Sequence, residues 1–274
     1  MEDLLEGIRV VTIAQNLPGP LAVARLRKIG ASIVKIEPPT GDPFLALSGA
    51  WHAEMHEGIS IERLDLKAES GQARVTELLS DADIFISSQR PSALARLRLD
   101  PDSLRTRFPR LRMLRILGSV RAPEHAGHDL TYQAQAGLVG DGMPRTLAAD
   151  VMASERVFAS ALALLRQPPG TLIDVGLVES LEPLLAPLRH GLTTPRGVLG
   201  GTAPRYRVYA TRAGRIAVAA LESHFEVRMY DALGLTVGTD LAPRFRERTA
   251  EEWEAWALER DLPIVVIKEI ASGD

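Results

Sequence analysis

The sequence predicts an α/β protein: a large domain built on a mainly parallel sheet, followed by a smaller α+β domain. Up to residue 117, short β-branched runs alternate with segments of helical composition, the pattern of a parallel sheet covered on both faces. After a Gly- and Pro-rich stretch at 191–204, the order changes to a hairpin followed by helices. The 274 residues are enough for two domains of ordinary size.

The first elements form a βαβ unit. Strands are expected at 8–13 and 32–37, and the helix between them begins at Pro18 and ends at Gly30. The same pattern continues with a helix near 69–80, a strand at 83–87, a helix that begins at Pro91 and a strand near 111–117. Repeated βα units of this length favour parallel pairing.

The second half is predominantly helical at first. Helical composition runs from 129 to 190, interrupted by one strand at 170–175. Later we expect a hairpin of strands 206–210 and 215–219, helices near 222–234 and 249–260, and a last strand at 264–267. The sequence therefore predicts a large domain at 1–190, a linker at 191–204 and a small domain at 205–274.

The composition excludes several classes of protein. With 46% apolar and 24% charged residues, the chain is not intrinsically disordered. A net charge of −3 gives no general attraction to nucleic acid or an anionic membrane. The absence of cysteine excludes disulfides, zinc–thiolate sites and a cysteine nucleophile, and it favours a reducing compartment. With an acidic N-terminus and no apolar run of ~18 residues, the chain is expected to be cytoplasmic and not membrane-bound.

Two polar clusters allow more than one interpretation. A solvated surface accounts for most of a run of arginines, while one or two could bind a nucleotide phosphate; nucleic acid is disfavoured because aromatic residues for stacking are nearly absent. The run comprises Arg90, Arg96, Arg98, Arg105, Arg107, Arg110, Arg112 and Arg115. His52 and His56 could share a metal ion on a helix, but the order His-Glu-x-x-His is missing, so no metal is expected.

A few residues stand at helix starts, where polar groups serve either as caps or as functional groups. Pro18 and Gly19 begin the first helix, whose free N–H groups could bind an anion or a carbonyl, or could simply form a turn. His128, Asp150 and Glu222 each precede or begin a predicted helix. Taken singly, these three are better explained as helix caps or ordinary surface residues than as catalytic groups.

Several blocks of the chain together resemble the class III CoA-transferase family, which includes CaiB/BaiF-type transferases and alpha-methylacyl-CoA racemase. The blocks lie at 5–11, 17–20, 29–43, 64–67, 81–86, 89–91, 96–99, 127–129, 172–179 and 248–254. The resemblance implies a Rossmann-like large domain and a small domain, with two subunits forming an interlocked homodimer. It also implies an acyl-CoA substrate and no cofactor beyond the coenzyme A of that thioester.

The resemblance assigns roles to the three acid–base residues. Asp150 matches the family's nucleophile or racemase base, and His128 with Glu222 match the racemase pair that acts from the opposite face. We expect Lys35, Arg90 and Arg96, together with Pro18 and Gly19, to contact CoA because they lie at strand ends or at a helix start. Free backbone N–H groups near Asp150 would stabilise the enolate oxygen.

Three functions remain open at this point. Racemisation or epimerisation of a 2-methylacyl-CoA by two-base proton transfer is favoured by His128 and Glu222. The alternative is CoA transfer between carboxylic acids through an aspartyl intermediate at Asp150. The third is a catalytically weak CoA-binding subunit. It is suggested by bulky residues at 151–156, where the racemases have glycines, and by a C-terminus that is short for the family.

Overall fold

The computed structural model describes residues 3–269 and confirms the predicted α/β class. Contacts divide the chain into two units between Pro183 and Leu184, within helix α10 (Glu182–Arg189). No helix among the described residues is long and apolar enough to cross a membrane.

The first unit contains a six-stranded sheet in which every pairing is parallel, in the order β3-β2-β1-β4-β5-β6. Its strands are β1 (Arg9–Thr12), β2 (Ser32–Glu37), β3 (Ser60–Arg63), β4 (Ile84–Ser87), β5 (Arg112–Leu117) and β6 (Leu172–Gly176). This is the Rossmann strand order, in which the chain reverses its direction of travel between β1 and β4. Strand β3 was not predicted, because it is an edge strand with a mostly exposed surface and no apolar run.

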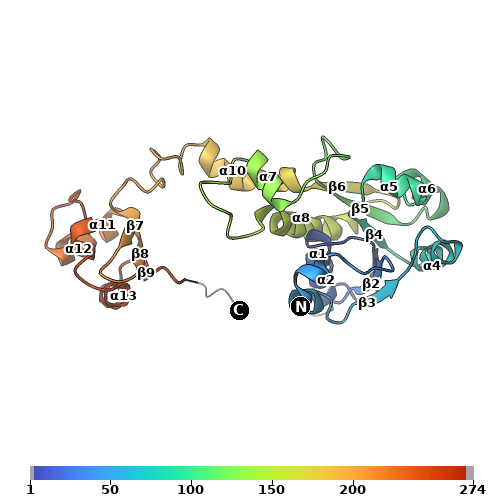
Figure 1. The fold of residues 1–274 in the computed structure, drawn as a ribbon, viewed down its shortest axis with the longest axis horizontal. Helices are drawn as coiled ribbons and strands as arrows, with labels where there is room; N and C mark the ends of the chain where they lie inside the picture. The colour runs from blue at the N-terminus through green and yellow to red at the C-terminus, as the bar shows by residue number, and fades with distance from the viewer. Residues whose placement is uncertain (1–2, 270–274) are drawn as a thin grey trace. The chain divides into compact units, whose positions relative to one another are not determined.

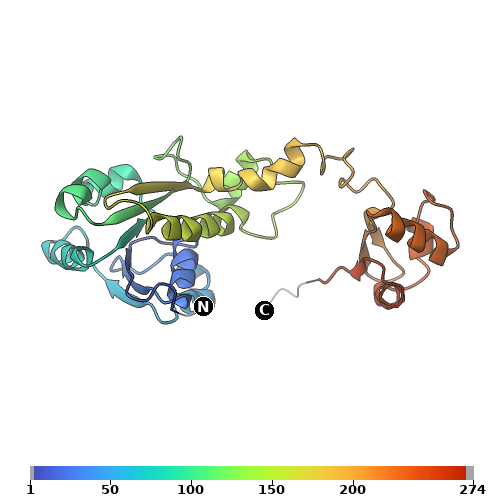
Figure 2. The same ribbon diagram turned by 180° about the vertical axis from the view of Figure 1, so that it is seen from behind.

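Helices cover both faces of this sheet. Alternate strand residues separate the two cores, so Val10 packs with α1 (Pro18–Lys28) and α8 (Ala148–Leu164), whereas Val11 packs on the opposite face. Figure 1 and Figure 2 show α1 and α8 side by side. The opposite face is covered by α4 (Glu69–Ser80), α5 (Pro91–Arg96) and α6 (Pro101–Arg107).

Shorter helices connect these layers. They are α2 (Phe44–Leu47), α3 (Gly49–Met55), α7 (Asp129–Gln135) and α9 (Leu177–Ser180). Because α7 and α8 lie between the parallel neighbours β5 and β6, the first turn of α8 follows a crossover that starts from the carboxyl edge of the sheet. That edge is where α/β sheets bind their ligands.

The second unit has its own antiparallel sheet in the order β7-β8-β9. Its elements are β7 (Tyr206–Ala210), β8 (Arg215–Ala219), α11 (Ser223–Leu233), α12 (Ala242–Phe245), α13 (Ala250–Leu258) and β9 (Ile264–Val266). Trp253 is fully buried in its core and donates its indole N–H to the carbonyl of Phe245 at 2.8 Å. The predicted small α+β domain is therefore confirmed in its type.

Gly19 is required by packing at the start of α1. A Cβ atom at this position would lie 2.3 Å from the Cβ of Ala14, which follows β1. That distance is shorter than a van der Waals contact, so no side chain fits at position 19 unless α1 shifts. Pro18 and Gly19 are both buried. Their contact with a ligand stays a prediction, whereas the need for glycine follows from this distance alone.

We expect Gly19→Ala to lower the free energy of unfolding by about 1–3 kcal/mol, because the added methyl must push α1 away from β1. Urea denaturation followed by far-UV circular dichroism measures the change. Gly49→Ala is the matched control, since Gly49 begins α3 and a Cβ there would meet no atom within 4 Å. Equal midpoints for the two variants would contradict the packing explanation.

Candidate active site

Asp150 lies in the first turn of α8, where its backbone is held by a residue of another helix. The carboxylate of Asp129, the first residue of α7, accepts the N–H groups of Ala149 at 2.8 Å and Asp150 at 3.0 Å. Leu147, the N-cap residue of α8, offers no side-chain cap. Asp129 therefore caps α8 from a distance of about twenty residues in sequence, and it ties the starts of α7 and α8 together.

Gln133 fixes the other oxygen of Asp129. Its amide nitrogen donates to Asp129 Oδ2 at 2.5 Å and to the carbonyl of Thr146 at 2.9 Å. Asp129 is 5% exposed and Gln133 3% exposed, so the network is closed to solvent. Gln133 therefore holds the loop before α8 at Thr146, while Asp129 holds the first turn of α8 at Ala149.

The surroundings of Asp150 favour its protonated form. Burial, followed by the negative charge of Asp129, raises the pKa of Asp150 to about 7. Both protonation states of the carboxyl are therefore present near neutral pH. A group of this kind can donate or accept a proton in the same pH range, which is the requirement for general acid–base catalysis.

His128 immediately precedes Asp129 and is the N-cap residue of α7. Its backbone N–H donates to the Thr131 hydroxyl at 3.1 Å, and its side chain is exposed. Because Asp129 bonds to the backbone of Asp150, the structure brings His128 and Asp150 to neighbouring helix starts. Glu222 is the exposed N-cap residue of α11 in the second unit, so its pairing with His128 stays a prediction.

The expected enolate donors near Asp150 are not free. The N–H groups of Ala149 and Asp150 donate to Asp129, and that of Val151 donates to the carbonyl of Leu147 at 2.9 Å. These three N–H groups are therefore already engaged, and the stabilisation of an enolate oxygen at this helix start stays a prediction. The capping carboxylate of Asp129, distant in sequence, could not be seen from the local pattern.

The surroundings of Lys35 count against the prediction that it binds CoA. Its side chain is fully buried, and its ammonium group contacts Asp42 Oδ2 at 2.6 Å, His56 Nε2 at 2.8 Å and Glu37 Oε1 at 3.1 Å. These contacts use all three N–H donors of the ammonium group. A phosphate cannot reach Lys35 without breaking a buried ion pair.

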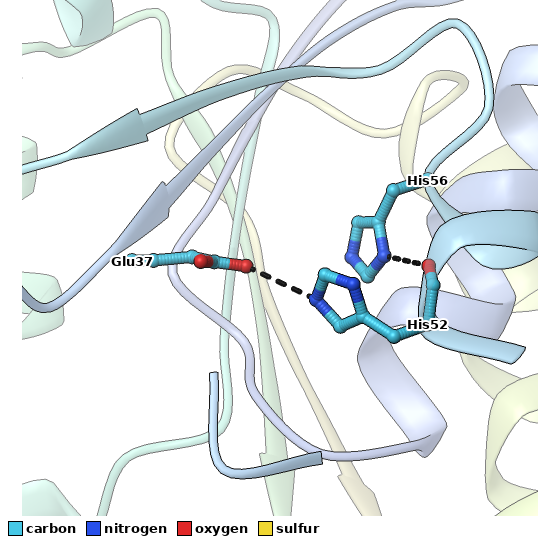
Figure 3. Close-up of side chains that lie close together, drawn as sticks. All are labelled: Glu37, His52 and His56. Atoms are coloured by element: carbon cyan, nitrogen blue, oxygen red, sulfur yellow. Dashed lines mark hydrogen bonds and ion pairs between the residues drawn. The ribbon is translucent and has the colours of Figure 1, made fainter. Parts of the chain in front are cut away.

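The same cluster accounts for the spacing of four residues between His52 and His56. Figure 3 shows His52 pointing to Glu37 and His56 bonded to the carbonyl of His52. Because His56 Nδ1 donates to that carbonyl at 2.6 Å, its Nε2 is free to accept from Lys35. The ligand atoms of Glu37, His52 and His56 lie within 4.8 Å of one another, but the Lys35 ammonium already contacts two of these residues as an internal cation.

A basic groove of about 1080 Å³ lies between α4 and the α5–α6 region. Arg96, predicted to contact CoA, is exposed in it. Three further cationic residues in the lining were not assigned from the sequence: Lys67, Arg98 and Arg107. Lys67 belongs to one of the blocks that carry the family resemblance, which could have identified it. Arg98 takes a left-handed backbone conformation with φ 54°, which favours glycine and is uncommon for a residue with a side chain.

Arg90 lies at the start of α5 and lines a separate pocket of about 130 Å³ with Tyr132. Glu124 accepts the backbone N–H and the hydroxyl of Ser92, both at 2.8 Å. These hydrogen bonds, with the charges of Arg90 and Arg96, hold the pKa of Glu124 below its usual range. The two arginines therefore both act on a negative group at the start of α5.

Comparison with known protein sequences identifies one family. The family described as CoA-transferase family III matches residues 5–272. Relatives include a CaiB/BaiF CoA-transferase family protein of Caenorhabditis elegans, 25% identical over 92% of this chain and 82% of its own length. Alpha-methylacyl-CoA racemase of Mus musculus is 30% identical over 85% of this chain, which spans 65% of the racemase. An (R)-2-hydroxy-4-methylpentanoate CoA-transferase of Clostridioides difficile is 26% identical over 97% of this chain and 80% of its own length.

Solved structures share the fold. A CaiB/BaiF family protein from Brucella suis superposes with a TM-score of 0.81 at 20% identity, covering 99% of this chain and 85% of its own. A hypothetical protein from Mycobacterium tuberculosis gives a TM-score of 0.84 at 21% identity, covering 97% and 84%. The fold is thus common to proteins with little sequence identity.

We expect acid to destabilise the protein through His56. Burial is the main reason that the pKa of His56 is lowered from 6.5, and the nearby Lys35 ammonium adds to it. Neutral His56 therefore contributes stability above pH 6.5, and this contribution is lost as the pH falls from 6.5 toward the lowered value. Between pH 7 and pH 5 the wild type should lose about 1 kcal/mol more unfolding free energy than His56→Gln, by urea denaturation.

His125→Gln is the control for this measurement, because His125 is exposed. It should keep the steeper pH dependence of the wild type. A His56→Gln variant with that same dependence would show that the buried imidazole does not titrate on unfolding.

Proposed function

Because the chain belongs to CoA-transferase family III, we propose that it acts on acyl-CoA thioesters, with Asp150 as the residue that meets the acyl group. The observation that carries this proposal is the half-buried Asp150 in the first turn of α8, beside Asp129 and close in structure to the exposed His128. A carboxyl that changes protonation state near neutral pH suits a reaction in which a proton is moved.

The proposed reaction is racemisation or epimerisation of a 2-methylacyl-CoA. The thioester acidifies the proton on its α-carbon, so one base can remove that proton and an acid on the opposite face can return one. Asp150 serves one face, and His128 paired with Glu222 serves the other. This chemistry uses the acidity of the thioester itself, so the proposal includes no metal and no cofactor besides the coenzyme A of the substrate.

CoA transfer is the second candidate, and it places a different demand on Asp150. The carboxylate would attack the thioester carbonyl and form a mixed anhydride, with CoA as the leaving group. Only the ionised carboxylate is nucleophilic, and a pKa of about 7 leaves roughly half of it ionised at neutral pH. Burial beside Asp129 therefore favours proton transfer over nucleophilic attack, while the transferases among the relatives keep this second candidate open.

For the CoA moiety we propose the basic groove between α4 and α5. Lys67, Arg96 and Arg98 supply cationic groups there for the phosphates of CoA. Arg90 would contact the part of the substrate nearest the small pocket that contains Tyr132. The proposal also includes a homodimer, in which a second copy completes the acyl site, and this part rests on the family resemblance.

The groove proposal predicts salt-sensitive CoA binding. Lys67→Ala combined with Arg96→Ala should weaken the binding of CoA about ten-fold or more at low salt, because two cations are lost, and the difference should shrink as salt screens the remaining charges. Isothermal titration calorimetry measures the dissociation constant. Arg110→Ala with Arg166→Ala removes the same charge from exposed positions outside the groove lining and should leave affinity unchanged. Equal losses in both double variants would reject the groove as the binding site.

The proton-transfer proposal predicts deuterium incorporation. In D₂O, either enantiomer of a 2-methylacyl-CoA should acquire deuterium at its α-carbon, because both faces carry a base. Asp150→Asn should lower the rate of inversion at least a hundred-fold, and the remaining deuterium exchange should occur only on the face served by His128. Mass spectrometry and chiral chromatography follow the two outcomes.

A transferase would give the opposite result. It would show no exchange, would need a carboxylate acceptor and would leave an adduct on Asp150 that hydroxylamine traps. Such an adduct without exchange would reject the racemase proposal in favour of the second candidate. No exchange and no adduct with several acyl-CoAs would instead favour a catalytically weak CoA-binding subunit.

A further inference from the structure

The protonation behaviour of Asp150 is unusual for its position. Asp150 is the third residue of α8, where a carboxylate is ordinarily stabilised by free N–H groups and by the positive end of the helix dipole. Those interactions lower the pKa of an acidic side chain, yet the pKa of Asp150 is raised. Burial is the main cause of this rise, and a second feature of the helix start adds to it.

Asp129 supplies that feature in two ways. Its Oδ1 atom accepts hydrogen bonds from the N–H groups of Ala149 and Asp150, so neither N–H group is available to the Asp150 side chain. Its charge also acts on the half-buried Asp150 from a buried position, where repulsion between like charges is less screened than in water. Both effects disfavour a second negative charge at this helix start.

We propose that Asp129 is a positioning residue, which fixes the first turn of α8 through the N–H groups of Ala149 and Asp150 and whose own negative charge disfavours a second negative charge on the Asp150 side chain. Gln133 holds the second oxygen of Asp129 and orients the carboxylate toward α8. The proposal deepens the proposed function, on which its link to catalysis rests, because a carboxyl protonated part of the time can return a proton to an enolate.

Burial is the main cause of the raised pKa of Asp150, and among the charged groups around α8 the one that acts on Asp150 is Asp129. Burial, followed by the charge of Asp150, raises the pKa of Tyr132 of α7, and the charge of Arg90 acts in the opposite direction. Charged groups on α1, α9, β5 and β6 are engaged elsewhere: Arg25 with Glu155, Arg115 with Asp174, Arg156 with the Glu179 carbonyl, and the Glu179 carboxylate with Ser119.

The direct test measures the titration of Asp150 in the free protein by ¹³C NMR of labelled aspartate carboxyls, assigned with Asp150→Asn. The wild-type midpoint should lie near 7, and Asp129→Asn should lower it by about one pH unit or more, because the neutral amide keeps an acceptor oxygen but has no charge. Asp129→Ser is a second neutral variant for the case in which Asn disturbs folding. A wild-type midpoint below 5 would overturn the proposal without any variant.

Two controls separate charge from structure. Gln133→Met removes the donor to Asp129 but leaves its charge, so the Asp150 midpoint should stay within about 0.3 units. Glu155→Gln removes an exposed carboxylate from the same helix and should also leave it in place. A fall after Gln133→Met as large as after Asp129→Asn would assign the effect to loosened packing and overturn the proposal.

Activity provides the second readout. The pH dependence of kcat/KM for deuterium exchange should shift in Asp129→Asn by the same amount as the NMR midpoint, while KM changes little. A normal midpoint shift in a protein that shows no exchange would reject the proposed reaction and leave the inference about Asp129 intact. An unchanged Asp150 midpoint in an Asp129→Asn variant that still exchanges deuterium would overturn the inference about Asp129 and leave the proposed reaction intact.

Discussion

The common direction of the six strands is the constraint on which the candidate site depends. Because all pairs are parallel, each strand ends at the same edge, and each crossover must begin there. The starts of α1 and α5 follow directly from β1 and β4, and α8 follows the crossover from β5. Gly19, Arg90 and Asp150 are far apart in sequence, yet this topology assigns each to a helix start that follows the carboxyl edge.

Within that framework, the chemistry depends on which helix starts keep free N–H groups. The first turn of α8 gives two of them to Asp129, so this helix start is occupied by a carboxylate of the protein itself. An internal anion there excludes the usual role of a helix N-terminus as an anion site. Burial and, after it, this internal anion raise the pKa of Asp150.

Burial divides the basic residues into two kinds. Lys35 lies on β2, as expected. Its ammonium group is enclosed by Asp42, Glu37 and His56, and these contacts tie the segment that contains α2 and α3 to β2. Arg96 and Lys67 are left to solvent in the groove. Lys35 and Arg96 are both basic residues that lie on or after a strand in the sequence, so only the packing of 42–56 against β2 distinguishes the buried cation from the exposed one.

The sequence by itself determined the α/β class, the order of most elements and the family, because these depend on local periodicity and on contiguous blocks of residues. It could not reveal β3, whose exposed edge position leaves no apolar signal, nor the burial of Lys35. It identified Asp150 but not its protonation state. That state depends on Asp129, which is brought into contact only by the packing of α7 against α8, and burial and charge proximity of this kind are properties of the tertiary structure alone.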